Sequence, residues 1–371
     1  MKSRIVKILI ASCVAASMLA GGCSGKSTNT SKAESSTEST AESVAESTSA
    51  SDSESKEPAQ RELFAMDTYM TVQAYGEHGE EAVEQAEKEI ERLDALLSTG
   101  SEDSEIGKIN ASGGGELSED GSYLVQRALE LNKETDGAFD IAIYPIMEAW
   151  GFPTQDFKVP SEEEIQSLLP LTKCSNIHYD EKNGKISFAE SGMKIDLGGI
   201  AKGYTSSQIM KIYKDCGVTS GLVNLGGNVQ ALGTKTDGSD WRVAVQSPYD
   251  ESDYLGVLAI QNKAVITSGG YERYFEQDGK TYHHIIDPET GYPAENGLIS
   301  VTIASEDGTL ADGLSTSLFI MGKDKAIEFW KKHSDEFDTI LMTDDNKLYV
   351  TEGIADAFEP ADGYEVEVIS K

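Results

Sequence analysis

Apolar and polar residues follow two different periods along the chain, and each period predicts a different kind of element. A period of three to four residues over 79–98 predicts an amphipathic helix. The apolar face of that helix consists of Ala82, Ala86, Ile90, Leu93 and Leu97. Further helices are predicted over 121–134, over 161–171, over 198–217 after a short loop, and over 310–322.

Alternation with a period of two predicts strands in the segments between these helices. A hairpin is predicted over 176–190, because Asn183 and Gly184 are typical turn residues. The other predicted strands lie over 62–76, 193–197, 221–233 (bent by paired glycines), 241–248, 255–269 and 274–287. Strands and helices do not alternate steadily, so the pattern favours an α+β fold over a doubly wound sheet.

The first 22 residues have the pattern of an export signal. Lys2 and Arg4 precede an apolar run that is too short to span a bilayer comfortably, and the run ends in small residues before Cys23. The sequence "LAGGC" predicts a lipoprotein signal peptide over 1–22, with Cys23 as the lipidated first residue of the mature chain. Secretion without a lipid is the alternative. The lipoprotein interpretation predicts a location on the outer side of the cell membrane, held by the lipid.

Residues 23–60 form a segment rich in Ser, Glu and Thr that contains almost no large apolar side chains. Such a segment cannot bury enough surface to offset the entropy of ordering, so we expect a disordered tether. The folded part is then predicted to cover residues 61–371.

The net charge limits the classes of partner, and the cysteine content limits how the fold can be stabilised. A formal charge of −33 excludes nucleic acid as a partner and makes any phosphate-bearing ligand dependent on a cation. The predicted folded part contains only Cys174 and Cys216, so no disulfide framework supports it, and the sequence leaves open whether these two pair.

Three segments carry candidate chemistry, and each also has a purely structural interpretation. In "KIDLGGIAKGY" (194–204), Asp196 and Lys202 flank paired glycines at a helix start, an arrangement that suits a phosphate but also a tight turn. In "LADGLSTSLF" (310–319), Asp312 and Thr316 share a helix face and offer oxygen ligands to Mg²⁺, although Asp312 could instead cap the helix.

The third segment is "HHIIDPETGYP" (283–293), which holds two of the five histidines of the chain. A neutral imidazole there could accept a proton from an attacking hydroxyl, and a structural histidine at a strand end is the alternative. The aromatic residues of "TDGAFDIAIYPIMEAWGF" (135–152) could enclose a planar ring, although aromatic residues more often fill a core.

Together these segments resemble the ApbE-type flavin transferases, which are FAD:protein FMN transferases of the bacterial envelope. The resemblance covers residues 62–350 and also includes "AMDTYMTV", "SEDSEIGKIN", "VNLGGNVQALG", "WRVAVQSP" and "SGGYERYF". It implies a single large α+β domain of that family's type. It further implies Mg²⁺-dependent transfer of FMN from FAD to a Thr or Ser hydroxyl of an exported acceptor protein, through a phosphoester bond and with release of AMP.

The resemblance also implies roles for individual residues. The predicted FAD contacts are Met66, Ala138, Phe139, Asp140, Asp196, Lys202 and Ile286. The predicted metal ligands are Asp312, Thr316 and the backbone carbonyl of Gly199, and His284 is the predicted base, with His283 as a structural neighbour. The chain departs from the family after "LLST", where Gly100 stands in place of an aromatic residue that covers the flavin.

Two other functions remain open from the sequence. A solute-binding lipoprotein that holds FAD without turnover fits the signal and the tether equally well, but gives no reason for Asp312, Thr316 and His284. An FAD pyrophosphatase, whose acceptor is water, would need the same residues as the transferase.

Overall fold

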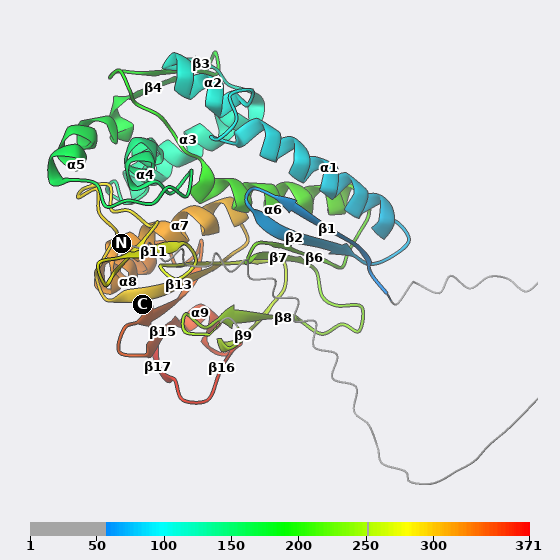
Figure 1. Cartoon of the computed structure of the whole chain (residues 1–371). Helices are drawn as coiled ribbons and strands as arrows, with labels where there is room; N and C mark the ends of the chain where they lie inside the picture. The colour runs from blue at the N-terminus through cyan, green and yellow to red at the C-terminus, as the bar shows by residue number, and fades with distance from the viewer. Residues whose placement is uncertain (1–56, 251) are drawn as a thin grey trace, which may run out of the picture.

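A nine-stranded sheet runs through the part of the chain that the computed structural model describes, residues 57–250 and 252–371 (Figure 1). Its strand order is β1-β2-β6-β7-β10-β13-β14-β15-β17, and neighbouring strands are antiparallel except for the parallel pair β15 and β17. The strands are β1 (Ala59–Ala65), β2 (Thr68–Ala74), β6 (Gly221–Leu225), β7 (Asn228–Leu232), β10 (Ala264–Gly269), β13 (Leu298–Ser305), β14 (Asp338–Thr343), β15 (Lys347–Thr351) and β17 (Glu365–Ile369).

Helices cover one face of this sheet, and a small three-stranded sheet packs on the other face. The helices of this layer are α1 (Gly79–Leu97), α6 (Gly198–Asp215), α7 (Gly308–Met321) and α8 (Lys323–His333). The opposite layer contains β8 (Trp241–Gln246), β9 (Tyr254–Ile260), α9 (Glu352–Ala355) and β16 (Phe358–Pro360).

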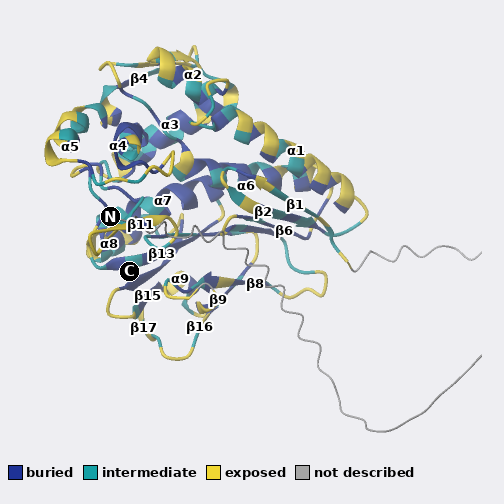
Figure 2. Ribbon diagram, in the orientation of Figure 1, coloured by how far each residue is buried: buried dark blue, intermediate teal, exposed yellow. Residues whose placement is uncertain are grey.

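The central strands are buried on both faces, which explains their nearly continuous apolar sequence. In β14, Leu341 packs in the cluster shared with α7, whereas Ile340 and Met342 pack against β8 and β9. Alternate side chains therefore fill two different cores, one on each side of the sheet. Figure 2 shows this interior as buried and the outer sides of α1 and α5 as largely exposed.

The segment between α1 and α6 forms a separate layer above the helices. It contains α2 (Glu105–Ser112), β3 (Gly114–Glu116), α3 (Glu119–Glu134), α4 (Tyr144–Trp150), α5 (Glu162–Leu168), β4 (Ile177–Asp180), β5 (Lys185–Phe188) and short 3₁₀ turns at Ile141–Ile143, Leu169–Leu171 and Cys174–Asn176. The hairpin of β11 (Tyr274–Gln277) and β12 (Lys280–His283) lies below this layer, near α7 (Figure 1).

The α+β class and most predicted elements are confirmed, but several elements differ from the prediction. The strand predicted over 255–269 is two strands, β9 and β10, which belong to different sheets, and the strand predicted over 274–287 is the hairpin of β11 and β12. The predicted strand over 62–76 is a hairpin, because Met66 and Asp67 adopt left-handed backbone angles (φ 47° and 60°) and reverse the chain. The bent strand over 221–233 is likewise a hairpin, which turns at Gly226 and Gly227. Helix α2 lies in a segment for which no helix was predicted, and Ser104 caps its first turn.

The predicted strand over 193–197 is wrong. The side-chain amide of Asn110 accepts a hydrogen bond from the N–H of Ile195 and donates one to its carbonyl, each at 2.8 Å. Asn110 therefore takes the place of a neighbouring strand, and the segment runs as extended coil directly into α6 without the predicted loop.

The N-terminal predictions concern residues that lie almost entirely outside the described part. The signal peptide over 1–22, Cys23 and nearly all of the predicted tether fall there, although β1 begins at Ala59 and so includes the last two residues of the predicted tether. Within residues 57–250 and 252–371, no helix is long and apolar enough to cross a membrane.

Candidate active site

The candidate site begins where helices α6 and α7 cross at unusually close range. A Cβ atom at Gly203 would lie 2.1 Å from the carbonyl oxygen of Gly308 and 2.6 Å from Cβ of Asp312. Only glycine lets the backbones approach this closely, and the approach places Asp312 of α7 against the first turns of α6.

Asp312 is almost completely buried at this crossing, with 5% of its surface exposed. Its Oδ2 accepts a hydrogen bond from the N–H of Gly203 at 2.8 Å, and its Oδ1 accepts one from Nδ2 of Asn228 at 3.0 Å. Burial raises the pKa of Asp312, and the nearby charge of Lys202 opposes that rise. The cap of α7 is Asp307, which accepts from the N–H groups of Thr309 and Leu310, so the capping interpretation of Asp312 is wrong.

Thr316 lies one turn after Asp312 on the same face of α7 and is partly exposed. Its Oγ1 is 3.4 Å from Oγ of Ser268 in the neighbouring strand β10, and that Oγ lies 2.8 Å from Oγ of Ser315. Three neutral hydroxyl groups therefore meet one turn after Asp312, where α7 faces the sheet.

The third predicted ligand, Gly199, lies in the first turn of α6. In a regular helix its carbonyl accepts from the N–H of Gly203, and that same N–H donates to Asp312. The carbonyl oxygen of Gly199 and Oδ2 of Asp312 thus both lie on the side to which the N–H of Gly203 points. A Cβ at Gly199 would lie 3.2 Å from the ring of Phe139, so the ring covers this turn of the helix.

These oxygen atoms suit a hard divalent cation. A buried carboxylate with neutral donors only leaves charge uncompensated, and a carboxylate, a hydroxyl and a backbone carbonyl are ligands that Mg²⁺ accepts. No cluster of three or more His, Cys, Asp or Glu side chains occurs in the described part of the chain, so these residues would leave several metal positions to water or to a phosphate.

Asp196 and Lys202 flank the start of α6. Asp196 accepts a hydrogen bond from the N–H of Gly198 at 2.6 Å, and burial raises its pKa, with Asp67 adding to the rise. Lys202 makes no ion pair within 4.0 Å among the described residues, although its charge acts on Glu272, Asp312 and His284. The two predicted contacts thus lie at one end of the same helix, and the charge of Lys202 acts on three titratable side chains of the site.

The two histidines of the third motif differ as their predicted roles require. His283 uses both ring nitrogens, because Nε2 lies 3.1 Å from the carbonyl of Ala294 and Nδ1 accepts from the N–H of Ile285 at 3.3 Å. His284 uses only Nδ1, which lies 3.2 Å from the carbonyl oxygen of Arg273. A carbonyl can only accept, so Nδ1 carries the proton and Nε2 keeps a free lone pair.

His284 is also held in its neutral form. Burial, together with the charges of Arg273, His283 and Lys202, lowers its pKa to about 3. An uncharged imidazole with one free lone pair can accept a proton from a hydroxyl. The assignment of His284 as base stays a prediction.

The loop after His284 is fixed by an aromatic cluster. Ile286 and Pro293 form a backbone bridge that closes the loop, and the backbone carbonyl of Asp287 accepts a hydrogen bond from the N–H of Gly291 at 2.8 Å. Nε1 of Trp150 donates to the carbonyl of Gly291 at 2.9 Å. Ile286 is buried in this cluster, and Trp150 fills a core rather than enclosing a ligand. The loop therefore provides a rigid support for His284.

The other predicted FAD contacts lie around the same end of α6. Met66 occupies the hairpin turn between β1 and β2, where its N–H donates to Oδ1 of Asp94 at 3.0 Å and its sulfur lies 3.9 Å from Oγ1 of Thr205 in α6. Ala138 is partly exposed, whereas the ring of Phe139 is buried in the main core.

Asp140 is engaged with the protein itself. Its carboxylate accepts hydrogen bonds from the N–H of Ala142, from both the N–H and the thiol of Cys174, and from Nδ2 of Asn132. Burial raises its pKa. Asp140 thus anchors the segment that carries Ala138 and Phe139. Cys174 and Cys216 are both free thiols in the structure.

This constellation of residues can be compared with known proteins. The model of the ApbE family matches residues 66–341, about three quarters of the chain. The chain belongs to the ApbE family.

Two curated relatives of this chain carry the same name, FAD:protein FMN transferase. An FAD:protein FMN transferase of Klebsiella pneumoniae (strain 342) is 35% identical over 282 residues, which cover 75% of this chain and 87% of that protein. An FAD:protein FMN transferase of Treponema pallidum (strain Nichols) is 31% identical over 294 residues, which cover 74% of this chain and 80% of that protein.

Solved ApbE structures share the fold. The ApbE protein of Thermotoga maritima superposes with a TM-score of 0.73 at 34% identity, and covers 82% of this chain and 97% of its own. The flavinyl transferase ApbE of Pseudomonas stutzeri, in its apo form, gives a TM-score of 0.69 at 30% identity, with 77% of this chain and 91% of its own covered. The prediction of an ApbE-type domain is therefore confirmed.

Two charged residues of the site have no predicted role, although their motif "SGGYERYF" contributed to the ApbE resemblance. Glu272 is exposed by surface area, yet surrounding protein raises its pKa to about 7, with burial as the main cause. Solvent thus reaches part of the Glu272 side chain, while neighbouring protein atoms remove water from around its carboxyl group. Arg273 is exposed as well, and its charge acts on Asp196, Glu272 and His284.

The position of Gly100, where this chain departs from the ApbE pattern, is open. Only Oγ of Ser98 lies within 4 Å of a Cβ built there, at 3.9 Å. The backbone after α1 would therefore accommodate a side chain, and the glycine is not required by packing.

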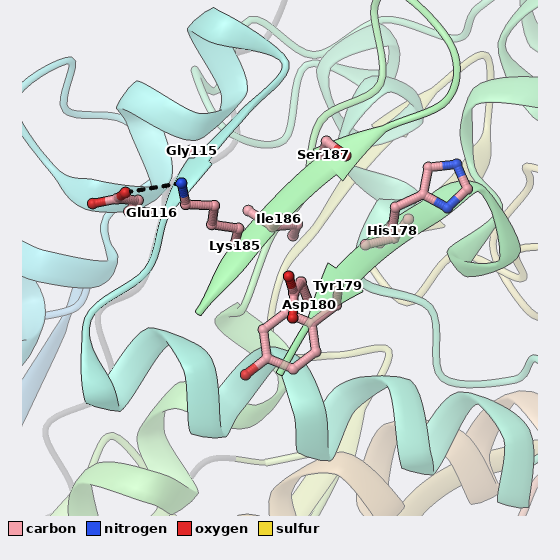
Figure 3. Close-up of a pocket in the computed structure, with 9 residues that line it drawn as sticks. Gly115, Glu116, His178, Tyr179, Asp180, Lys185, Ile186 and Ser187 are labelled. Atoms are coloured by element: carbon pink, nitrogen blue, oxygen red, sulfur yellow. Dashed lines mark ion pairs between the residues drawn. The ribbon is translucent and has the colours of Figure 1, made fainter. Parts of the chain in front are cut away.

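A separate hollow lies on the small sheet of β3, β5 and β4. Figure 3 shows it, with Lys185 and Glu116 joined by an ion pair of 3.2 Å at its edge. None of the predicted site residues lines it. Because it is an open surface depression without converging polar groups, we assign it no part in the site.

Proposed function

We propose that this chain transfers FMN from FAD to a Thr or Ser hydroxyl of an acceptor protein, forming a phosphoester bond and releasing AMP. The observation that carries the proposal is that one lysine, next to the crossing of α6 and α7, exerts its charge both on the buried carboxylate at that crossing and on a neutral imidazole. These groups are Asp312, Lys202 and His284. Membership of the ApbE family and the names of the curated relatives support the same reaction.

The residues suggest how the reaction proceeds. The acceptor oxygen attacks the phosphorus of the FMN half, its proton passes to Nε2 of His284, and the bond to the bridging oxygen breaks with its electron pair leaving on AMP. The carbonyl of Arg273 holds the imidazole in the required tautomer. The charge of Lys202 acts on both carboxylates, Asp312 and Glu272, and opposes the repulsion that they would exert on the pyrophosphate.

Mg²⁺ is proposed as the cofactor, held by Asp312, Thr316 and the carbonyl of Gly199. When bound, it would neutralise charge on the pyrophosphate oxygens. The need for a cation is marked in this protein because its formal charge is −33.

We further propose that the enzyme works on the outer side of the cell membrane, anchored through a lipid on Cys23. The support is the signal pattern of residues 1–22. The acceptor is then another exported protein.

Release of AMP distinguishes this proposal from its alternatives. The full chain incubated with FAD, Mg²⁺ and a Thr-containing acceptor protein should yield AMP and flavin covalently bound to the acceptor in equal amounts. Binding of FAD without any AMP would favour a solute-binding lipoprotein, and AMP with only free FMN would favour a pyrophosphatase.

A further inference from the structure

The backbone and the side chain of Arg273 have two separate functions in this structure. Its carbonyl oxygen accepts hydrogen bonds from the backbone N–H of His284 at 3.0 Å and lies 3.2 Å from Nδ1 of the same residue. Its guanidinium extends elsewhere, where Nη2 donates to the carbonyl of Phe152 at 3.3 Å. Replacing the side chain would therefore leave the contact to His284 in place.

The guanidinium lies among the charged groups of the site but pairs with none of them. Its charge acts on Asp196 from the start of α6, on His284 from the end of β12 and on its neighbour Glu272. Yet no carboxylate of the described residues lies within 4.0 Å of it, whereas Arg61, Arg92, Arg127 and Arg242 each form an ion pair by that criterion. Arg273 is thus a positioned cation without an anion.

The contact with Phe152 gives the guanidinium one fixed partner in the protein. Phe152 is buried in the aromatic cluster that also supports the His284 loop. One N–H group of the guanidinium donates to the carbonyl of Phe152 at 3.3 Å, and its remaining four N–H groups stay available. Their fork geometry matches two oxygen atoms of a phosphate.

From this geometry we propose that Arg273 binds the phosphoryl group of FAD that is transferred. The proposal rests on the proposed function, since it assigns the phosphate nearest His284 to the FMN half. Arg273 then combines two tasks, because its carbonyl orients the proton acceptor while its guanidinium holds the phosphorus that the acceptor oxygen attacks. As the new O–P bond forms and the bond to AMP breaks, the guanidinium stays paired with the non-bridging oxygens.

The test uses the full chain and FAD binding followed by flavin fluorescence. Arg273→Ala should weaken FAD binding by roughly 10- to 100-fold, the range expected for a lost hydrogen bond to a charged group. Added guanidinium ion should restore part of the affinity, because it can occupy the vacated position. Arg242→Ala is the matched control, since Arg242 pairs with Glu359 on an exposed surface, and it should leave FAD binding unchanged.

Two results would overturn the inference. One is unchanged FAD affinity in Arg273→Ala. The other is a loss of affinity that guanidinium does not restore and that accompanies a lower melting temperature, which would assign Arg273 to the support of the Phe152 loop. AMP release by the wild-type chain is measured in the same preparations, so that failure of the proposed reaction is seen separately from failure of this assignment.

Discussion

The backbone N–H of Gly203 donates to the buried carboxylate of Asp312 at 2.8 Å, across two helices whose sequence positions differ by 109 residues. This bond ties the predicted metal ligand to the helix that carries Lys202. The geometry depends on the missing side chain at Gly203, since any Cβ there would overlap the carbonyl of Gly308.

Gly203→Ala should therefore destabilise the fold and abolish transfer together. The added methyl group must push α6 and α7 apart, which we expect to cost about 1–3 kcal/mol or more. Thermal unfolding measures the effect. Gly100→Ala is the control, because the space around Gly100 is open, and an equal drop in melting temperature for both variants would contradict the assignment.

Asp312→Asn should abolish FMN transfer in the presence of Mg²⁺ while keeping the size of the side chain. The amide can still accept from Gly203, but it no longer supplies the charge that a cation requires. FAD binding should weaken as well, because the pyrophosphate loses its bridging cation in an acidic protein. Transfer at the wild-type rate, at the same FAD and Mg²⁺ concentrations, would disprove the metal site.

His284→Ala should slow transfer by roughly 10²- to 10⁴-fold, the usual range for a positioned base, and leave FAD affinity nearly unchanged. His283→Ala should affect stability more than transfer, since both ring nitrogens of His283 are used within the protein. Flavin fluorescence and covalent flavin on the acceptor give the two readouts for each variant. A larger loss of transfer in His283→Ala would mean that the wrong imidazole has been assigned.

The raised pKa of Glu272 predicts that the stability of the fold depends on pH when no divalent cation is present. Its pKa is raised from 4.5 to about 7, so the folded protein keeps a proton that the unfolded chain releases between these values. Stability from this group is therefore present below pH 4.5 and falls as pH rises toward 7. Glu272→Gln should raise the melting temperature relative to wild type at about pH 8 by more than at about pH 4.5. An equal difference at both pH values would contradict the shift.

Cys23→Ser tests the proposed anchor. If Cys23 carries the lipid, the variant should leave the membrane fraction and appear in the medium or as an unprocessed precursor. Fractionation followed by mass measurement of the N-terminal peptide reports both outcomes. A processed variant that still partitions with the membrane would remove lipidation from the proposal.

Local patterns predicted those elements whose hydrophobic period is uninterrupted. Helix α1 and the Asn183-Gly184 hairpin follow this rule. The turn at Met66 and Asp67 was missed because Met66 is not typical of a left-handed turn, no glycine follows Asp67, and the alternation of the flanking strands continues through the turn. Residues 193–197 look like a strand because their partner is the side chain of Asn110, which no local pattern reveals.

Only those site residues that stand in a recognisable sequence motif could be predicted. Asp312, Lys202 and His284 each stood in a recognisable segment, and the fold brings them together. Glu272 and Arg273 acquire their importance from charges supplied by three other segments, so their own sequence context gives no signal. Their role required the tertiary arrangement.

The separation of the site's parts along the chain also determines when a ligand can bind. The Lys202 end of α6 and the Asp312 turn of α7 are separated in the sequence by β6, β7, β10 and β13, so the site exists only once α6 and α7 have packed together. A chain that is still being synthesised therefore has no site to fill. Ligand binding selects the completed domain and stabilises it by mass action, so the protein meets its ligand after it has folded.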